Sequence, residues 1–442
     1  MAPSDSINPS STSLSADAVP LDPSSADALA SSGFDYRRVD VASPEFVPFI
    51  KAVARGFLDP EQTDDQVEGS RDGLAARRLT GVFDAHAVDP ATPIATIDSW
   101  VSELSLPGRR TIPMWAISGV TVSPTRRRRG IARAMLEGEL RAAAGAGLAI
   151  AGLTVSEATI YGRFGFAPAV SATDWVIDTR RARWTGPIAP GRVEAVDRER
   201  LRAELGAVHD LARPAQPGDV PGWPGLWRRI AGLAPGTEDR KVRGVVYVDE
   251  SGAVRGAMAY TLSDDSSDFS RHELTIAMLV ADGDDAYRAL WRFALEHDLV
   301  STVRAPLRSA DEPLRWMIAD QRAATVTVGD HGWLRILDLP TVLAARSYAA
   351  PVSLALGIAD ELGFAHGVWH VAVDGDGNGV AEPIDAVPDL TMTVADLGAI
   401  LLGGVRVTTL REAGRVNGSR DAASALDRAF ASDRTPYLSI WY

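Results

Sequence analysis

Between residues 33 and 180, apolar residues recur at strand and helix spacing, in an alternating order that is typical of an α/β domain. Residues 35–39 predict a short strand, and residues 45–57 predict a helix with apolar side chains three or four positions apart. A second helix is predicted from apolar residues that recur every four positions, at Ala132, Leu136, Leu140 and Ala144. The apolar residues 148–155 predict the strand that follows. We therefore expect one mixed domain at 33–180.

A similar mixture of patterns returns after a junction that is rich in arginine and contains proline, at residues 179–192. Its predicted elements are a helical stretch with a Pro-rich break at 197–233, a hairpin at 242–262 that turns at Glu250-Ser251-Gly252, a strand at 273–280, an amphipathic helix at 285–296 and a strand pair at 325–337. This order resembles that of the first domain. We expect a second, degenerate copy of the same fold at 190–338.

A third region follows at 340–442. Its predicted elements are strands at 362–373 and 389–394 and helices at 394–402 and 422–430. The chain then closes on aromatic and β-branched residues, Thr435-Pro436-Tyr437-Leu438-Ser439-Ile440-Trp441-Tyr442, which would be costly to leave in water. Two interpretations stay open here. Either a last strand completes a sheet, or the terminal carboxylate is held at a defined, partly desolvated place.

Composition limits the class of protein. The 442 residues suggest two to four domains, and 46% hydrophobic with 23% charged residues is typical of a folded soluble protein. The absence of cysteine excludes disulfides and thiolate chemistry, and it agrees with a reducing compartment. Residues 1–32 lack the basic start and apolar centre of a signal peptide and predict a disordered extension. No apolar run is long enough to span a bilayer, so we expect a cytoplasmic protein without a membrane partner.

The strongest chemical signal lies at 120–136, where the strand Val120-Thr121-Val122 ends, four arginines follow Pro124, and a helix begins at Gly130. Unpaired N–H groups at a helix start, with the positive end of the helix dipole, bind phosphate or pyrophosphate. Gly130 permits close approach of an anion because it has no Cβ. The alternative is a solvated basic face or a nucleic-acid patch. The formal net charge of −13 argues against a nucleic-acid partner.

The spacing Arg127-x-x-Gly130-x-Ala132 after this strand resembles the acetyl-CoA pyrophosphate loop of GNAT-superfamily N-acetyltransferases. The order of the next segments strengthens the resemblance. An apolar strand leads to Ser156-Glu157, then to a short helix that carries Tyr161, and then to Gly165-Phe166. These segments look like the next GNAT strand, the tyrosine-bearing helix and the entry to the following strand.

Two later segments, His331-Gly332-Trp333-Leu334-Arg335-Ile336 and Ala429-Phe430-Ala431-Ser432-Asp433, extend the match. With them, residues 33–442 resemble the Eis (enhanced intracellular survival) family of GNAT N-acetyltransferases. The resemblance implies an α/β (α+β) chain: a catalytic GNAT domain, a second GNAT-like domain without cofactor, and a sterol carrier protein-like C-terminal domain whose end enters the active site. It also implies acetyl-CoA as cosubstrate, homohexamers, and acetylation of amines, aminoglycosides prominently, at several positions of one molecule in some members.

Residue by residue, the resemblance assigns cofactor binding to three segments. These are the strand end Val120, Thr121 and Val122 for the pantetheine arm, the loop Arg128, Arg129, Gly130, Ile131, Ala132 and Arg133 for the pyrophosphate, and the flanking Ser156 and Glu157. Tyr161 matches the general acid, and the carboxylate of the last residue, here Tyr442, matches the general base. The best-known members end in phenylalanine, so the phenol of Tyr442 needs a hydrogen-bond partner or water. Trp441 gives the pocket less negative charge than an acid would.

Other signals favour structural interpretations. Residues 374–379 resemble the start of a calcium loop, but position 12 is Asp385 rather than Glu, so an Asp-Gly hairpin turn is the better prediction. His366 and His370 lie in a strand-like segment without the glutamate of a zinc motif, and no metal is expected. Asp59 is a candidate wall of a cationic pocket. The expected activity is acetylation of aminoglycoside-like or polyamine amines. The alternatives are a protein lysine acetyltransferase and a lipid-binding protein that uses the C-terminal domain.

Overall fold

The first domain alternates strands and helices in a computed structural model that describes residues 14–263 and 271–442. Its elements are β1 (Asp35–Val39), α2 (Phe46–Gly56), α3 (Asp64–Leu74), β2 (Arg78–Phe83), β3 (Ala95–Leu106), β4 (Arg110–Val122), α4 (Ile131–Gly145), β5 (Ile150–Thr154), α5 (Ala158–Tyr161) and β6 (Ala167–Asp178). The strands predicted at 35–39 and 148–155 and the helix predicted at 45–57 are confirmed apart from their terminal residues. Their apolar faces are buried, as at Phe46 and Phe49 of α2.

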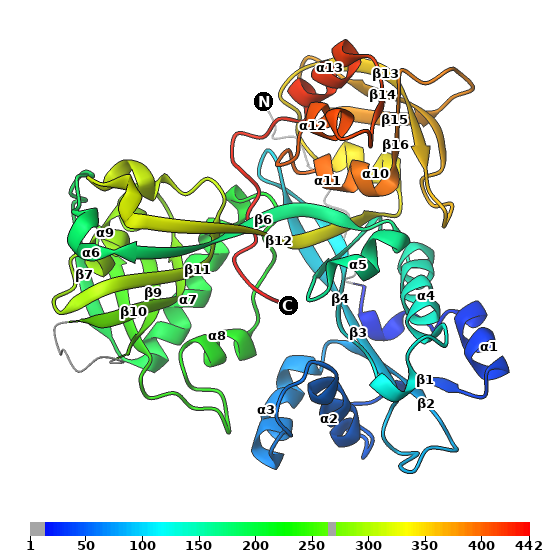
Figure 1. Ribbon diagram of the computed structural model, residues 1–442, viewed down its shortest axis with the longest axis horizontal. Helices are drawn as coiled ribbons and strands as arrows, with labels where there is room; N and C mark the ends of the chain where they lie inside the picture. The colour runs from blue at the N-terminus through cyan, green and yellow to red at the C-terminus, as the bar shows by residue number, and fades with distance from the viewer. Residues whose placement is uncertain (1–13, 264–270) are drawn as a thin grey trace, which may run out of the picture.

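The N-terminal segment is a correction to the sequence analysis, because residues 14–32 are folded onto the first domain. A helix, α1 (Pro23–Ser31), begins after the capping side chain of Asp22 and packs against α4 (Figure 1). Leu29 is buried, and the hydroxyl of Ser25 donates a 2.6 Å hydrogen bond to the carbonyl of Ala134. The prediction of disorder over 1–32 is therefore wrong for 14–32, because these few apolar and capping residues find partners on α4. Residues 1–13 lie outside the described residues.

The second domain repeats the element order of the first. After the short α6 (Thr179–Ala182), its elements are β7 (Arg192–Val196), α7 (Arg198–Ala212), α8 (Pro224–Ile230), β8 (Arg243–Val248), β9 (Val254–Ser263), β10 (His272–Ala281), α9 (Asp284–Leu295), β11 (Val300–Ser309) and β12 (Ala324–Ile336). The predicted hairpin, strand and amphipathic helix correspond to β8–β9, β10 and α9. The hairpin turn closes through a 2.9 Å bond from the Asp249 N–H to the Ala253 carbonyl.

One continuous sheet of 12 strands joins the two domains, in the order β1-β2-β3-β4-β5-β12-β6-β11-β10-β9-β8-β7. Strand β12 pairs along β6, and its last residues, Gly332 to Ile336, also pair with β5 of the first domain. The prediction of a strand pair at 325–337 is wrong, because Asp330 and Gly332 produce bulges rather than a turn. The end of β12 also completes the sheet of the first domain, so the two domains share this strand.

The third domain is built on a separate five-stranded sheet in the order β15-β14-β13-β16-β17. Its elements are α10 (Leu339–Ala345), β13 (Val352–Ala359), β14 (Gly367–Val373), β15 (Gly379–Pro383), β16 (Leu390–Thr393), α11 (Val394–Ile400), α12 (Val407–Glu412), β17 (Asn417–Gly418) and α13 (Arg420–Phe430). The strand predicted from 362 begins only at 367. A buried ion pair of 2.6 Å, from Arg335 on β12 to Asp360, ties this domain to the sheet.

The end of the chain is neither helix nor strand. After α13 the last residues run down between the first two domains, as the red segment of Figure 1 shows, and the terminus lies beside β4 rather than at an edge of the sheet. Leu438 and Ile440 are buried on this path. The interpretation as a last strand is therefore wrong, because side chains and loops of several elements satisfy this backbone instead of a neighbouring strand.

The packing of α1 predicts a measurable contribution to stability. We expect Leu29→Ala to lower the free energy of unfolding by about 2–5 kcal/mol, because a buried leucine is removed and a cavity remains. Leu14→Ala, at an exposed leucine of the same segment, is the matched control and should change it by less than about 0.5 kcal/mol. Urea denaturation followed by circular dichroism measures both. Equal, negligible effects of the two substitutions would contradict the docking of α1.

Candidate active site

A wedge between two parallel strands forms the centre of the site. Strands β4 and β5 pair at only two positions, Trp115 with Ala151 and Ala116 with Gly152, and then diverge. Gly119 interrupts β4 in a left-handed conformation (φ +61°), and a Cβ there would lie 2.2 Å from a carboxylate oxygen of Asp98. Only glycine is compatible with this position. Beyond it, the backbone of β4 faces the wedge without a partner strand on the β5 side.

The arginine-rich loop lies at the open end of the wedge. Gly130 precedes α4 with φ +78°, and a Cβ added there would have no atom within 4 Å. No side chain caps the helix, so the N–H groups of its first turn are available to an anion. Arg128 and Arg129 are exposed beside it. The fit to a pyrophosphate is therefore good: an open cradle, free N–H groups and exposed positive charge.

The other predicted cofactor residues border the same wedge. Val120 lines its inner cavity, and Thr121 is held by a 2.6 Å hydrogen bond between its hydroxyl and that of Thr96. Val122 ends β4, and Ile131, Ala132 and Arg133 form the first turn of α4. Ser156 and Glu157 are exposed where β5 leads into α5. Residues from three separate segments are thus brought to one opening.

A cavity of about 120 Å³ lies where the wedge meets the end of the chain. Its walls are Phe57, Ile117, Ser118, Gly119, Val120, Leu153, Thr154, Ser156, Tyr161, Trp441 and Tyr442. The two residues predicted to be catalytic, Tyr161 and Tyr442, therefore share one cavity. Asp59 is exposed after α2 and is not among these walls, whereas Phe57 is.

Tyr161 is the last residue of the short helix α5 and is buried. Its ring packs edge to face against Phe166, with 6.3 Å between the ring centroids. Burial raises the pKa of the Tyr161 hydroxyl above its usual value near 10, and the negative charge of Glu157 raises it further. The phenol therefore keeps its proton through the neutral and mildly alkaline range and can donate it.

The terminal residue is held at both of its ends. The hydroxyl of Thr154, at the end of β5, donates a 2.7 Å hydrogen bond to a terminal carboxylate oxygen of Tyr442. The ring of Tyr442 meets the edge of Trp100 at 5.5 Å, and its hydroxyl reaches the backbone of Gly152, where a side chain would collide with it. Burial raises the pKa of this phenol, so it stays neutral. The carboxylate is then the charged group that the chain end presents.

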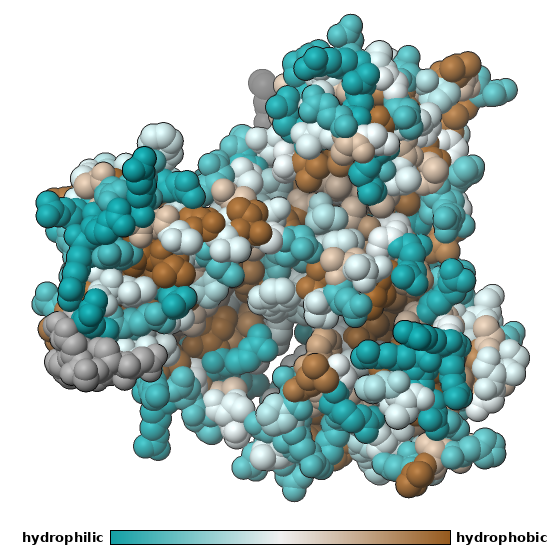
Figure 2. All heavy atoms as spheres, viewed as in Figure 1, coloured by the Kyte–Doolittle hydropathy of each residue, from teal (hydrophilic) through white to brown (hydrophobic). Residues whose placement is uncertain are grey.

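A hollow leads from the surface to the chain end. Figure 2 shows it between the lobe of the second domain and the helices α2 and α3 of the first. Trp441 and Phe57, which both line the cavity at the chain end, are half-exposed. Behind them, the guanidinium of Arg77 stacks 3.7 Å from the Trp100 ring and pairs with Asp98 at 2.7 Å. Aromatic rings and this ion pair therefore surround the chain end, while α3 begins with the acidic residues Asp64 and Asp65.

Sequence reasoning missed Phe57, Trp100 and Thr154 as site residues. None of them belongs to a motif, and each lies in a helix end or strand that the sequence explains by packing alone. The predicted hairpin turn at 374–379 is present, since a carboxylate oxygen of Asp374 accepts hydrogen bonds from the N–H groups of Asp376 and Asn378 between β14 and β15. Across residues 14–263 and 271–442, no three His, Asp or Glu side chains cluster in a way that would hold a metal ion.

Comparison with known proteins identifies the family. Residues 36–169 and 223–336 each match an acetyltransferase (GNAT) domain family, and residues 339–439 match a sterol carrier protein domain family. The N-acetyltransferase Eis of Mycobacterium tuberculosis is 32% identical over 75% of this chain and 81% of its own length. The chain belongs to the Eis family of N-acetyltransferases. An uncharacterized N-acetyltransferase of Streptomyces avermitilis is 34% identical over 90% of this chain and 96% of its own length.

Solved structures agree with this assignment to the Eis family. The crystal structure of Eis1 from Mycobacterium abscessus superimposes with a TM-score of 0.78, at 30% identity, over 92% of this chain and 100% of that chain. A GCN5-related N-acetyltransferase from Kribbella flavida shares the fold, with a TM-score of 0.71 at 24% identity over 93% of this chain and all of its own. Two tandem GNAT domains and a sterol carrier protein-like domain are thus confirmed.

Membership in the Eis family makes the protein an N-acetyltransferase, and the GNAT fold implies acetyl-CoA as the acetyl donor and a small-molecule acceptor. Among the helices that the structure describes, none combines the length and the apolar character needed to cross a membrane.

The loop geometry predicts that Arg128 and Arg129 contribute to acetyl-CoA affinity. We expect Arg128→Ala or Arg129→Ala to raise the acetyl-CoA Kd about tenfold, because each removes a charge-assisted contact to phosphate. The KM for acetyl-CoA should rise more than kcat falls. Arg420→Ala, at an exposed arginine of α13, is the control and should leave the Kd unchanged in isothermal titration calorimetry. Unchanged affinity in both single variants and in the double variant would contradict the pyrophosphate assignment.

Proposed function

We propose that this Eis-family enzyme transfers acetyl from acetyl-CoA to primary amines of aminoglycoside-like or polyamine molecules, at several positions where the acceptor offers them. The observation that carries the proposal is the shared cavity: Tyr161 and the terminal carboxylate of Tyr442 face the same space at the wedge of β4 and β5. A proton acceptor and a proton donor would then both be available to a thioester bound in this cavity.

The cosubstrate would be held by residues that border the wedge. The β4 backbone at 120–122 would meet the pantetheine arm, the first turn of α4 with Arg128 and Arg129 would meet the pyrophosphate, and Ser156 and Glu157 would flank the thioester end. Acetyl-CoA supplies an acetyl group that is activated as a thioester. The open position at Gly130 supports this arrangement, because an anion can approach the backbone there without meeting a side chain.

Removal of the amine proton is assigned to the carboxylate of Tyr442. An amine attacks only as the free base, so its proton must leave, and an α-carboxylate with an ordinary pKa of about 3.3–3.7 is a weak base in water. Apolar surroundings make a carboxylate a stronger base. Trp441, Phe57 and Trp100 provide such surroundings. Thr154 orients one carboxylate oxygen, and the other would accept the proton directly or through a water.

Tyr161 is assigned the return of a proton to the departing thiolate. Its raised pKa keeps the hydroxyl protonated, and its position at the end of α5 is fixed by packing against Phe166. Proton transfer by a positioned general acid or general base typically raises the reaction rate by roughly 10²–10⁴-fold. Binding raises the rate further, because it holds the amine close to the thioester.

The acceptor class follows from the family resemblance, and the hollow of Figure 2 is a surface opening by which an amine would reach the chain end. A protein lysine remains the alternative acceptor, since the hollow opens at the surface. The lipid-binding alternative loses support, because the end of the third domain enters the first domain's site. A homohexamer in the cytoplasm completes the proposal and is supported by the resemblance and by the lack of cysteine.

A panel of amines tests the acceptor class and the carboxylate together. We expect acetylation of aminoglycosides or polyamines above that of lysine peptides, measured as released CoA thiol, which no cysteine of the protein obscures. With the best acceptor, a semisynthetic C-terminal amide should lose about 10²-fold in kcat, because it removes the charge with little change in shape. Tyr442→Phe keeps the carboxylate and should be nearly silent. A fully active amide would contradict the carboxylate's role, and activity on lysine peptides alone would favour the alternative acceptor.

Tyr161→Phe should bind acetyl-CoA normally but lose about 10²-fold or more in kcat, because only the proton donor is removed. Since burial raises the pKa of Tyr161 above its ordinary value, the hydroxyl should keep its proton in the mildly alkaline range. The kcat profile of the wild type between pH 7 and 9 should therefore show no alkaline decline from this group. Tyr36→Phe, at another buried tyrosine of the domain, is the control. If chemistry limits the rate and Tyr161→Phe keeps a near-normal kcat, then Tyr161 only packs in the site and is not the general acid.

A further inference from the structure

The second domain has an opening that corresponds to the cofactor wedge of the first. Strands β10 and β11 run parallel, pair only between His272–Val300 and Thr275–Arg304, and then separate. In the first domain the helix after this position begins at an arginine-rich loop, whereas α9 begins with Asp284 and Asp285. These two carboxylates lie at the positive end of the helix, where a phosphate would bind, and they pair with Arg288 of the same helix at 3.2 and 3.1 Å. The start of α9 therefore does not offer a pyrophosphate the arginine loop that the start of α4 offers.

The tail of the chain runs along this opening. A cavity of about 510 Å³ lies between the ends of β10 and β11 and the start of α9, and residues Asp433 to Ser439 form part of its wall. The hydroxyl of Tyr437 donates a 2.7 Å hydrogen bond to the carbonyl of Leu307 at the end of β11. Its N–H donates a 2.8 Å bond to the carbonyl of Pro217. The second domain thus binds its own chain end where a GNAT domain would bind cofactor.

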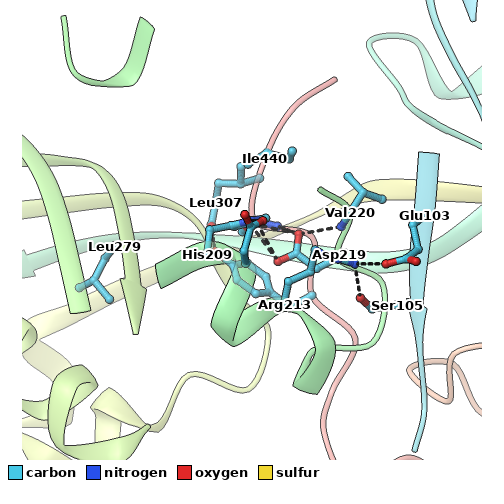
Figure 3. A network of polar contacts seen from close by, with 12 residues as sticks. Glu103, Ser105, His209, Arg213, Asp219, Val220, Leu279, Leu307 and Ile440 are labelled. Carbon is cyan, nitrogen blue, oxygen red and sulfur yellow. Dashed lines mark hydrogen bonds and ion pairs between the residues drawn. The ribbon is translucent and has the colours of Figure 1, made fainter. Parts of the chain in front are cut away.

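A buried carboxylate makes the next contact along the tail. One oxygen of Asp219 accepts hydrogen bonds from the N–H and the hydroxyl of Ser439, both at 3.1 Å, and from the N–H of Val220 (Figure 3). Asp219 is only 4% exposed. His209, also buried, lies 3.1 Å from the Ser439 hydroxyl and 3.5 Å from the other oxygen of Asp219. A buried charge with several donors holds its partner at a fixed place, because releasing it would leave the charge unpaired.

The loop that carries Asp219 is itself anchored to the first domain. The N–H of Ser105 on β3 donates a 3.0 Å bond to the backbone carbonyl of Asp219. Arg213, at the end of α7, pairs with Glu103 of β3 at 2.9 Å and reaches the Ser105 hydroxyl, as Figure 3 shows. The anchor of the tail therefore lies at the junction of the two domains, against β3, which is the strand that also carries Trp100.

Two further contacts hold the chain between Ser439 and the terminal carboxylate. A ring nitrogen of the buried His331, on β12, lies 2.9 Å from the carbonyl of Ile440, and burial lowers the pKa of this histidine, so it is neutral and donates from that nitrogen. Thr154 then holds the terminal carboxylate. From Ser439 to Tyr442 the chain can extend at most about 11 Å, at 3.3–3.6 Å for each residue. Such a short segment leaves the carboxylate little freedom once Ser439 is fixed.

We propose that the second GNAT-like domain binds the end of the chain and that Asp219 is a positioning residue. Asp219 fixes Ser439 and, through the last three residues, holds the terminal carboxylate in the first domain's site. The inference rests on the proposed function for its effect on the reaction, but not for the anchoring itself. Asp219 does not touch substrate. Its contribution is geometric, and displacing a reacting group by about 1 Å costs on the order of 10²-fold in rate.

The test measures the position of the tail separately from activity. Carboxypeptidase releases C-terminal aromatic residues only from an accessible chain end, and mass spectrometry reports the loss of Tyr442 and Trp441 from the full-length protein. We expect the wild type to resist, and Asp219→Ala to lose these residues at least tenfold faster, with kcat reduced tenfold or more and the acetyl-CoA Kd within twofold of wild type. Asp311→Ala is the matched control, because this exposed carboxylate on the same cavity makes no hydrogen bond to the tail among the described residues.

Ser439→Ala provides a second variant if Asp219→Ala fails to fold, because it removes a small hydroxyl from the tail side of the same contact. It should also speed digestion and lower kcat, and the effects of the two substitutions should be less than additive. A protected tail with normal kcat in both variants would overturn the proposal, as would reduced kcat with the tail still protected. Faster digestion with unchanged kcat would support the anchoring and instead contradict the carboxylate's role as base, so the two failures are distinguishable.

Discussion

The pairing of β12 between β5 and β6 is the constraint on which the rest of the structure depends. Backbone hydrogen bonds along this strand join two GNAT domains into one sheet and fix their relative orientation, so that the openings at β4–β5 and β10–β11 keep a constant separation. The chain end can be threaded past the second opening and into the first only because that separation is fixed. A flexible linker between the domains would leave the terminal carboxylate at a low effective concentration near the thioester site.

The same strand also orients the third domain. Arg335 of β12 is fully buried and donates to Asp360, while its other N–H groups reach the carbonyls of Phe164 and Ile336. Removing one partner of such a pair leaves an uncompensated buried charge, which makes this arrangement costly to break. The third domain is therefore held in one position on the sheet, and the tail that follows its last helix, α13, begins at a defined place.

The two GNAT domains illustrate how one fold supports different tasks through its loops. In the first, a glycine and arginines at the start of α4 leave free N–H groups and positive charge at the mouth of the wedge. In the second, the acidic residues at the start of α9 pair with Arg288 of the same helix, and the buried Asp219 accepts hydrogen bonds from Ser439 of the tail. Strand divergence is common to both. The difference lies in which side chains surround the gap.

The sequence by itself determined the features that depend on near neighbours: the helices and strands with clear apolar spacing, the hairpins with Asp-Gly or Gly turns, and the Arg-Gly loop whose chemistry follows from a strand, a turn and a helix in succession. Tyr161 and Tyr442 were named from the family resemblance, and the structure brings them to one cavity. The tertiary structure alone decided the folding of residues 14–32 onto α4, the passage of β12 through both domains, and the contacts that Thr154, Trp100 and Asp219 make with the chain end. Each of these depends on partners far away in the chain, because a side chain that packs or hydrogen-bonds across domains leaves no periodic or motif signal in its own segment.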